Sequence, residues 1–233
     1  KSMMVVESGV KRTRPVMVEH FKFLKQTTKK TAKLCIPAPT YLHMRGGRRV
    51  VNEKAYPDVE EFWSDITSAY RQEIAELANA GLEYLQIDDV SFACLCDEGI
   101  RAQVKRDGED PVQLPAKYVD VINSIIRPRA ASLSVTMHTC RGNHASMWMA
   151  EGGYDAVAEA VFQTEVDGFF LEYDSTRAGG FEPLRFVPGN KKVVLGLIST
   201  KTPVLESKDA LKRRIDEAAN YVPLENLCLS PQC

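Results

Sequence analysis

The chain has 233 residues, 44% of them hydrophobic and 26% charged, and its 30 Lys and Arg against 31 Asp and Glu leave a formal net charge of −1. This composition is typical of a globular protein and excludes a mainly disordered chain. The near-neutral charge gives no electrostatic sign of nucleic-acid binding, and the short apolar runs predict neither a membrane segment nor a signal peptide. We therefore expect a cytoplasmic protein with no nucleic-acid or membrane partner.

Six short apolar runs, each bounded by turn residues, predict buried strands. Helical patterns of apolar residues lie between them. The first 32 residues are expected to form an arm and a helix, and Met3–Val10 reads either as a strand remnant or as an inserted arm. The predicted strands are Leu34–Ala38, Tyr84–Ile87, Leu133–Met137, Gly168–Leu171, Val193–Ile198 and Leu227–Leu229, and the predicted helices are Val59–Asn79, Tyr118–Ile126, Tyr154–Gln163 and Lys208–Tyr221.

Strands that alternate with helices predict an α/β fold with a parallel sheet. A doubly wound sheet and a (β/α)₈ barrel both fit the spacing, but polar residues follow several strands in a row, as they do at the rim of a barrel. A closed barrel needs eight strands, so we expect about two βα units upstream of Lys1. We predict one catalytic barrel domain over residues 1–233, with the strands and helices of the barrel in residues 33–233.

His138 and Cys140 stand two residues apart at the end of a predicted strand, so their side chains share a face. An imidazole and a thiolate placed in this way can bind one Zn²⁺. The alternative is a core histidine beside a buried cysteine, and the His-x-Cys spacing alone does not decide between them.

The neighbouring strand ends carry two further groups that bind zinc, Glu172 and the C-terminal Cys233. Ion pairing or helix capping is the alternative role for Glu172, and a buried free thiol is the alternative for Cys233. Four such groups at the ends of separate strands favour a metal site. The six cysteines are scattered along a chain that needs no disulfide framework, which agrees with free thiols or metal ligands.

These motifs resemble the cobalamin-independent methionine synthase family, in particular its short bacterial relatives. The resemblance rests on His138-Thr139-Cys140, on Glu172, on Ser230-Pro231-Gln232-Cys233 and on the segment Gln86-Ile87-Asp88-Asp89. It implies a (β/α)₈ TIM barrel of the uroporphyrinogen decarboxylase and methionine synthase type. It also implies a zinc ion bound by His138, Cys140, Glu172 and Cys233, and an Asp88 that holds the amino group of homocysteine.

The sequence departs from the family pattern at three places. Ile198 stands where the full-length enzymes have a histidine thought to transfer a proton. The tryptophan that stacks on the pterin in the family is absent after Pro39, so that Tyr41 or Trp148 would have to replace it. The residues that bind the substrate carboxylate in the family would lie upstream of Lys1. The expected proton donor and half of the substrate pocket are therefore not identified in this sequence.

The resemblance implies a zinc-dependent methyltransferase that converts homocysteine to methionine, with a methyl-folate as donor. A corrinoid protein as donor, with another thiol as acceptor, is an alternative that the missing histidine favours slightly. A non-catalytic protein that binds zinc and a thiol is a third reading. The sequence leaves the oligomeric state open.

Overall fold

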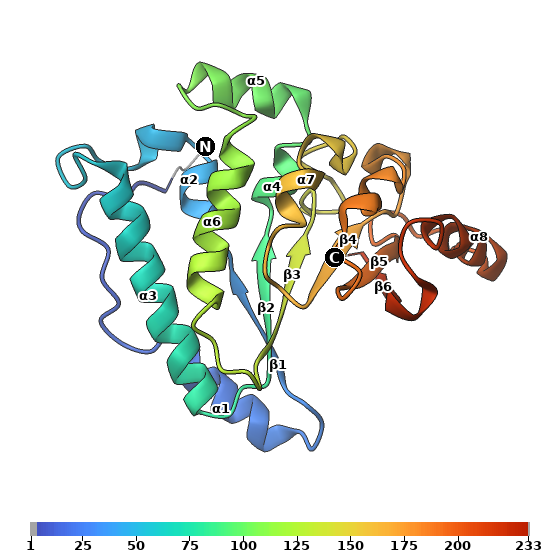
Figure 1. The fold of residues 1–233 in the computed structure, drawn as a ribbon, viewed down its shortest axis with the longest axis horizontal. Coiled ribbons are helices and arrows are strands. Elements are labelled where there is room, and N and C mark those ends of the chain that lie inside the picture. Colours follow the sequence, from blue (N-terminus) through green and yellow to red (C-terminus); the bar gives the residue numbers. More distant parts are fainter. Residues whose placement is uncertain (1–3, 233) are drawn as a thin grey trace.

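A computed structural model describes residues 4–232. Its centre is one sheet of six parallel strands, and the strands lie side by side in the same order as in the chain (Figure 1). The strands are β1 (Lys33–Pro37), β2 (Tyr84–Asp89), β3 (Ser134–Thr139), β4 (Gly168–Glu172), β5 (Lys192–Ile198) and β6 (Leu227–Pro231).

This strand order confirms the α/β prediction and separates its two variants. A doubly wound sheet reverses its strand order at a switch point, whereas a barrel adds each new strand on the same side. The order β1 to β6 has no reversal, so the sheet has the barrel type of topology. Within residues 4–232, β1 and β6 are the two edges of the sheet. That further βα units precede Lys1, and that the chain forms one domain, stay predictions.

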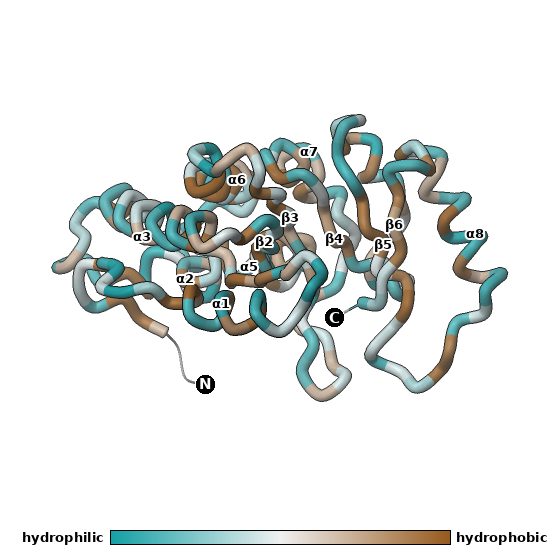
Figure 2. The backbone as a smooth tube through the Cα atoms, turned by 90° about the horizontal axis from the view of Figure 1, so that it is seen from below, coloured by the Kyte–Doolittle hydropathy of each residue, from teal (hydrophilic) through white to brown (hydrophobic). Residues whose placement is uncertain are grey.

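Helices connect the strands and lie along the sheet (Figures 1 and 2). They are α1 (Val18–Thr27), α2 (Tyr41–Met44), α3 (Val59–Asn79), α4 (Ser91–Cys94), α5 (Glu98–Arg106), α6 (Leu114–Ile126), α7 (Ala158–Val161) and α8 (Lys208–Ala218). Short 3₁₀ turns add η1 (Gly47–Val50), η2 (Tyr154–Ala156), η3 (Thr176–Ala178), η4 (Glu182–Phe186) and η5 (Leu224–Asn226). Among the described residues, no helix has the length and apolar character needed to cross a bilayer.

The longest helix, α3, has the predicted bounds because its signals are strong. Asp58 caps its first turn by accepting a hydrogen bond from the Glu60 backbone N–H, and its apolar residues recur at helical spacing. The continuous helix predicted over Tyr154–Gln163 is wrong. Val157 has φ −130° and ψ −9°, which are not helical angles, and it separates η2 from α7.

Alternate residues of each strand face opposite sides of the sheet, as the pattern of β3 predicts. Leu85, Val135 and Phe169 are fully buried and belong to the hydrophobic core. The alternating set on the neighbouring strands, Gln86 and Thr136, faces the inner side of the sheet. The same alternation places polar side chains at the carboxyl ends of the strands.

The opening segment packs as an arm against α3. Val6 pairs with Val51 in one isolated bridge, and Val10 N–H donates to Tyr56 Oη at 2.5 Å. Arg12 donates through Nε to Glu73 at 2.8 Å. Met3, at the start of the predicted segment, lies outside the described residues. The rest of that segment agrees with an inserted arm, which is the second of the two predicted alternatives.

Candidate active site at the carboxyl ends of the strands

The predicted site residues of β2, β3 and β4 meet at one end of the sheet. In the strand register, Asp88 lies opposite His138, and His138 lies opposite Phe170. A cavity of about 190 Å³ opens here, and its wall includes His138, Glu172 and Gln232. The carboxyl ends of the strands are where barrel enzymes place their active sites.

Asp88 contacts the histidine that was predicted to bind zinc. Its Oδ1 lies 3.4 Å from His138 Nδ1 and accepts a hydrogen bond from Gln86 Nε2 at 2.6 Å. Burial works to raise the pKa of Asp88, but hydrogen bonds from His138 and Gln86 outweigh it and keep the pKa below the ordinary value. The Asp88 side chain is 41% exposed. It is therefore a carboxylate that solvent or a ligand can reach.

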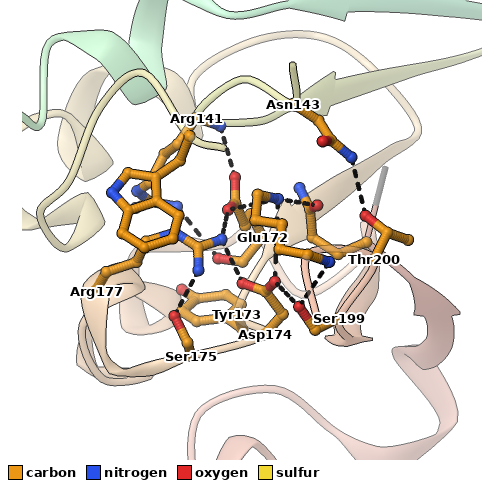
Figure 3. Close-up of polar contacts among 12 residues, drawn as sticks. Arg141, Asn143, Glu172, Tyr173, Asp174, Ser175, Arg177, Ser199 and Thr200 are labelled. Carbon is orange, nitrogen blue, oxygen red and sulfur yellow. Dashed lines mark hydrogen bonds and ion pairs between the residues drawn. The ribbon is translucent and has the colours of Figure 1, made fainter. Parts of the chain in front are cut away.

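Glu172 is held by cations and by the backbone (Figure 3). Its side chain is fully buried. Oε1 forms an ion pair with Arg177 and lies 3.6 Å from Lys201 Nζ, while Oε2 accepts a hydrogen bond from the Arg141 N–H at 2.5 Å. A buried carboxylate requires such partners, because an unpaired charge in the interior is very unfavourable.

The same cations connect Glu172 to the loops that follow β4 and β5. Arg177 Nη2 also donates to Asp174 Oδ1 at 2.6 Å, and Ser199 Oγ donates to Asp174 Oδ2 at 2.8 Å. Lys201 Nζ donates to Gln232 Oε1 at 2.6 Å. The network thus links two loops to the residue that precedes Cys233. The sequence did not predict Arg177 or Lys201 as site residues, because no local pattern distinguishes them from the other basic residues.

The strand that pairs with β4, β5, passes very close to it beside Glu172. Gly196 is the register partner of Glu172, and its carbonyl accepts a hydrogen bond from the Tyr173 N–H at 3.0 Å. A Cβ atom on Gly196 would lie only 2.9 Å from the carbonyl oxygen of Leu171. The close approach of the two strands therefore requires glycine at this position.

The structure brings some of the predicted ligands together. His138 and Glu172 line one cavity, and the buried Cys140 directly precedes Arg141, whose N–H binds Glu172. Cys233 lies outside the described residues. Within residues 4–232, no group of three His, Cys, Asp or Glu side chains is close enough to hold a metal ion. The four-ligand set stays a prediction.

The chemistry of these groups nevertheless fits zinc. Imidazole nitrogen, thiolate sulfur and carboxylate oxygen are its usual ligands. Both Glu172 oxygens have hydrogen-bond or ionic partners, but a carboxylate has about four lone-pair positions, so a metal can share it. Asp88 lies at Nδ1 of His138, in the manner of the carboxylates that orient metal-binding histidines.

The positions that depart from the family pattern have other partners. Ile198 ends β5 opposite Pro231, and its aliphatic side chain cannot transfer a proton. Tyr41 Oη accepts a hydrogen bond from Arg45 at 2.8 Å. The Trp148 ring packs 4.9 Å from the Arg177 guanidinium, so its indole borders the network around Glu172. Trp148 is 46% exposed.

Proteins of similar sequence include an uncharacterized bacterial protein and methionine synthases. The chain is 43% identical over 220 residues to YxjG of Bacillus subtilis (strain 168), a protein named as uncharacterized, and the match covers 93% of this chain and 58% of YxjG. It is 24% identical over 220 residues to the methionine synthase of Pyrococcus horikoshii, covering 94% of this chain and 55% of that protein. The chain thus spans a little over half the length of these relatives.

A solved structure agrees in fold and sequence. It is a crystal structure of a candidate vitamin-B12 independent methionine synthase from Listeria monocytogenes, with a TM-score of 0.78 and 36% identity, and the match covers 97% of this chain and 65% of that one. The family model described as "Cobalamin-independent synthase, Catalytic domain" matches residues 2–233. Because this match extends over nearly the whole chain, the chain belongs to the cobalamin-independent methionine synthase catalytic-domain family.

Proposed function

We propose that this chain carries the catalytic site of a methyltransferase that transfers a methyl group from a methyl-folate to the thiol of homocysteine, which gives methionine. The observation that carries the proposal is the contact of Asp88 with His138, which lines one cavity together with Glu172. The contact supports the proposal because Asp88, the carboxylate that we propose for the substrate ammonium, lies beside His138, a proposed metal ligand. The family names of the relatives add to this support.

The proposed zinc ligands are His138, Cys140, Glu172 and Cys233. When bound, zinc would supply the lowered thiol pKa that makes the substrate sulfur a nucleophile near neutral pH. The residues around the ligands would hold them in place: Asp88 accepts from His138 Nδ1, and Arg177 fixes the Glu172 carboxylate.

Asp88 has room for the substrate amine because its two oxygens differ. Oδ1 is occupied by Gln86 and His138, and the side chain as a whole is 41% exposed. An ammonium group that bound Asp88 Oδ2 would add a charge-assisted hydrogen bond without breaking these contacts.

The corrinoid alternative has no support, because the family to which the chain belongs is the cobalamin-independent type. A binding protein without turnover is the outcome that the experiment must separate from catalysis.

The test measures zinc content and methionine formation on the same preparation of the full chain. Under reducing conditions without chelators, we expect one zinc per chain, and methionine from homocysteine with a folate monoglutamate or polyglutamate as methyl donor. Cys140→Ser should lose tight zinc binding and activity but keep the fold. Zinc binding without methionine from either donor would leave a binding protein, and a chain without zinc would contradict the metal site. Thiol titration excludes oxidation as the cause.

A further inference from the structure

The cavity wall contains a lysine that the proposed chemistry does not use. Lys33 is the first residue of β1, is half-buried, and lines the same cavity as His138 and Glu172. Its Nζ lies 4.3 Å from the ring centroid of Phe170 and 5.1 Å from that of Tyr84. These rings stabilise the cation but do not neutralise it. Within residues 4–232, Lys33 forms no ion pair with a carboxylate.

Two polar atoms on the strands that follow β1 are buried without a partner. Gln86 Oε1 and Thr136 Oγ1 have no hydrogen bond among residues 4–232, and each residue is only 8% exposed. The amide orientation of Gln86 is fixed by chemistry, because a carboxylate such as Asp88 can only accept, so the amide nitrogen must face it. Buried polar atoms normally have partners, and Gln86 lines the cavity with Lys33, so its Oε1 points to a ligand.

The groups available to a ligand have complementary signs. Lys33 offers a positive charge and donor hydrogens, while Asp88 and Gln86 Oε1 offer acceptors. An α-amino acid presents the matching pair, a carboxylate and an ammonium group. A simple thiol presents neither, and an amine thiol presents only the ammonium.

We propose that Lys33 binds the carboxylate of the substrate, so that this chain recognises an amino-acid thiol at both of its charged groups. The ammonium binds Asp88 and Gln86 Oε1, and the sulfur faces the metal ligands. This inference rests on the proposed function and adds to it a residue that selects the substrate.

The test compares three ligands on the zinc-loaded full chain by titration calorimetry. Homocysteine carries both charged groups, 3-aminopropane-1-thiol lacks the carboxylate, and 4-mercaptobutanoic acid lacks the amine. Lys33→Met keeps the length and apolar stem of the side chain but removes the charge. We expect this variant to bind homocysteine and 4-mercaptobutanoic acid about 10- to 100-fold more weakly, the range for a charge-assisted hydrogen bond, and to bind the aminothiol as wild type does.

Two further variants are matched controls. Asp88→Asn should show the opposite pattern, with weaker binding of homocysteine and of the aminothiol only. Lys33→Arg keeps the charge and should recover most of the affinity for the two carboxylate ligands. Zinc content and thermal unfolding are measured for every variant, so that a loss of fold is seen directly.

Three outcomes would overturn the inference alone. Wild type binding the aminothiol as tightly as homocysteine would show that no carboxylate partner acts in the cavity, and this outcome needs no variant. Lys33→Met binding homocysteine as wild type does, or weakening all three ligands equally, would also contradict it. A wild-type chain that holds zinc but binds none of the three thiols would contradict the proposed function and the inference together.

Discussion

A single carboxylate, Glu172, depends on partners that come from three separate parts of the chain. Arg177 and Lys201 are almost completely buried with it, and the Arg141 N–H completes the set. Buried ion pairs add little net stability, because removing the charges from water offsets much of their attraction. Their effect is to fix the direction of the carboxylate, which matters more for a metal ligand than for the fold.

Replacing Arg177 with Met should therefore weaken zinc binding. The expected loss of affinity is about 10- to 100-fold, the usual effect of removing a group that orients a metal ligand. Competition with a chromophoric chelator under reducing conditions measures it.

Arg185→Met is the matched control for that substitution, because Arg185 is exposed and its guanidinium packs on the Phe186 ring. Equal zinc affinities of the two variants would contradict the orienting role of Arg177.

At the scale of elements, the arm and α3 are joined by one buried acid. Glu73 accepts hydrogen bonds from the Val16 and Met17 backbone N–H groups and from Arg12 Nε. Arg12 also binds Glu76 with two hydrogen bonds, at 2.8 and 2.7 Å. Arg12 and Glu73 side chains are 7% and 8% exposed, so this contact is largely removed from solvent.

Glu73→Ala should lower the free energy of unfolding by about 2 to 4 kcal/mol, because it leaves a buried guanidinium and two backbone donors short of a partner. Urea unfolding followed by circular dichroism measures the change. The exposed Glu61→Ala on the same helix should shift the free energy by less than about 0.5 kcal/mol. A similar small shift for Glu73→Ala would mean that the arm does not depend on this acid.

A second acid, Glu109, should make the stability of the fold depend on pH. Its Oε1 lies 3.3 Å from His43 Nε2 and accepts from the Arg48 N–H at 3.2 Å. The hydrogen bond with His43 is the main cause that keeps the pKa of Glu109 below the ordinary 4.5, against the opposing effect of burial. A lowered carboxyl pKa stabilises the fold above the unfolded pKa, and this contribution disappears as pH falls through the folded pKa.

The melting temperature of Glu109→Gln should therefore fall less than that of wild type between pH 6 and about pH 3, because the variant has no carboxylate at this position to protonate. Thermal unfolding at several pH values gives the two slopes. Glu98→Gln, an exposed change in the first turn of α5, serves as reference. If wild type and Glu109→Gln had the same slope, the His43 contact would carry no pH-dependent stability.

The elements that the sequence predicted are those with a strong apolar pattern. All six strands and α3 are found within about two residues of their predicted bounds. The helix α5 was not predicted because Val104 is its only buried residue among those described, so it has no apolar stripe to detect. Val157 takes non-helical backbone angles and interrupts a helix that the periodicity alone would have continued.

The site was predictable only where it follows strand ends. Asp88, His138 and Glu172 could be placed at one rim from the strand register, because carboxyl ends of parallel strands meet there. Their partners could not, because nothing local distinguishes Lys201 or Arg177 from the other basic residues of the chain. Which cations become buried depends on loops that pack only in the folded protein.

At the scale of the whole molecule, the described cysteines fall into two groups by burial. Cys35 and Cys228 are exposed, whereas Cys94, Cys96 and Cys140 are buried. Burial also raises the pKa of Cys94 to about 12 and that of Cys96 to about 11, which removes the reactive thiolate near neutral pH.

Iodoacetamide at pH 8 should consequently label Cys228 and Cys35 before Cys94 and Cys96. Peptide mapping by mass spectrometry at successive times gives the order, and labelling in denaturant confirms that every thiol can react. Cys35 should be the slower of the exposed pair, because burial and the charge of Asp88 raise its pKa. Labelling of Cys94 as fast as Cys228 would contradict the packing of α4.

Gly196 sets a limit on how this family member can be engineered. The backbone of β4 passes so close that a methyl group would meet the Leu171 carbonyl oxygen at 2.9 Å, and the register partner on that strand is Glu172. A saturation library at this position should return glycine alone among active clones, even though glycine performs no chemistry. Variation intended to change the ligand of this cavity therefore belongs at positions such as Lys33 of β1, which is half-buried and lines the cavity, and not at Gly196.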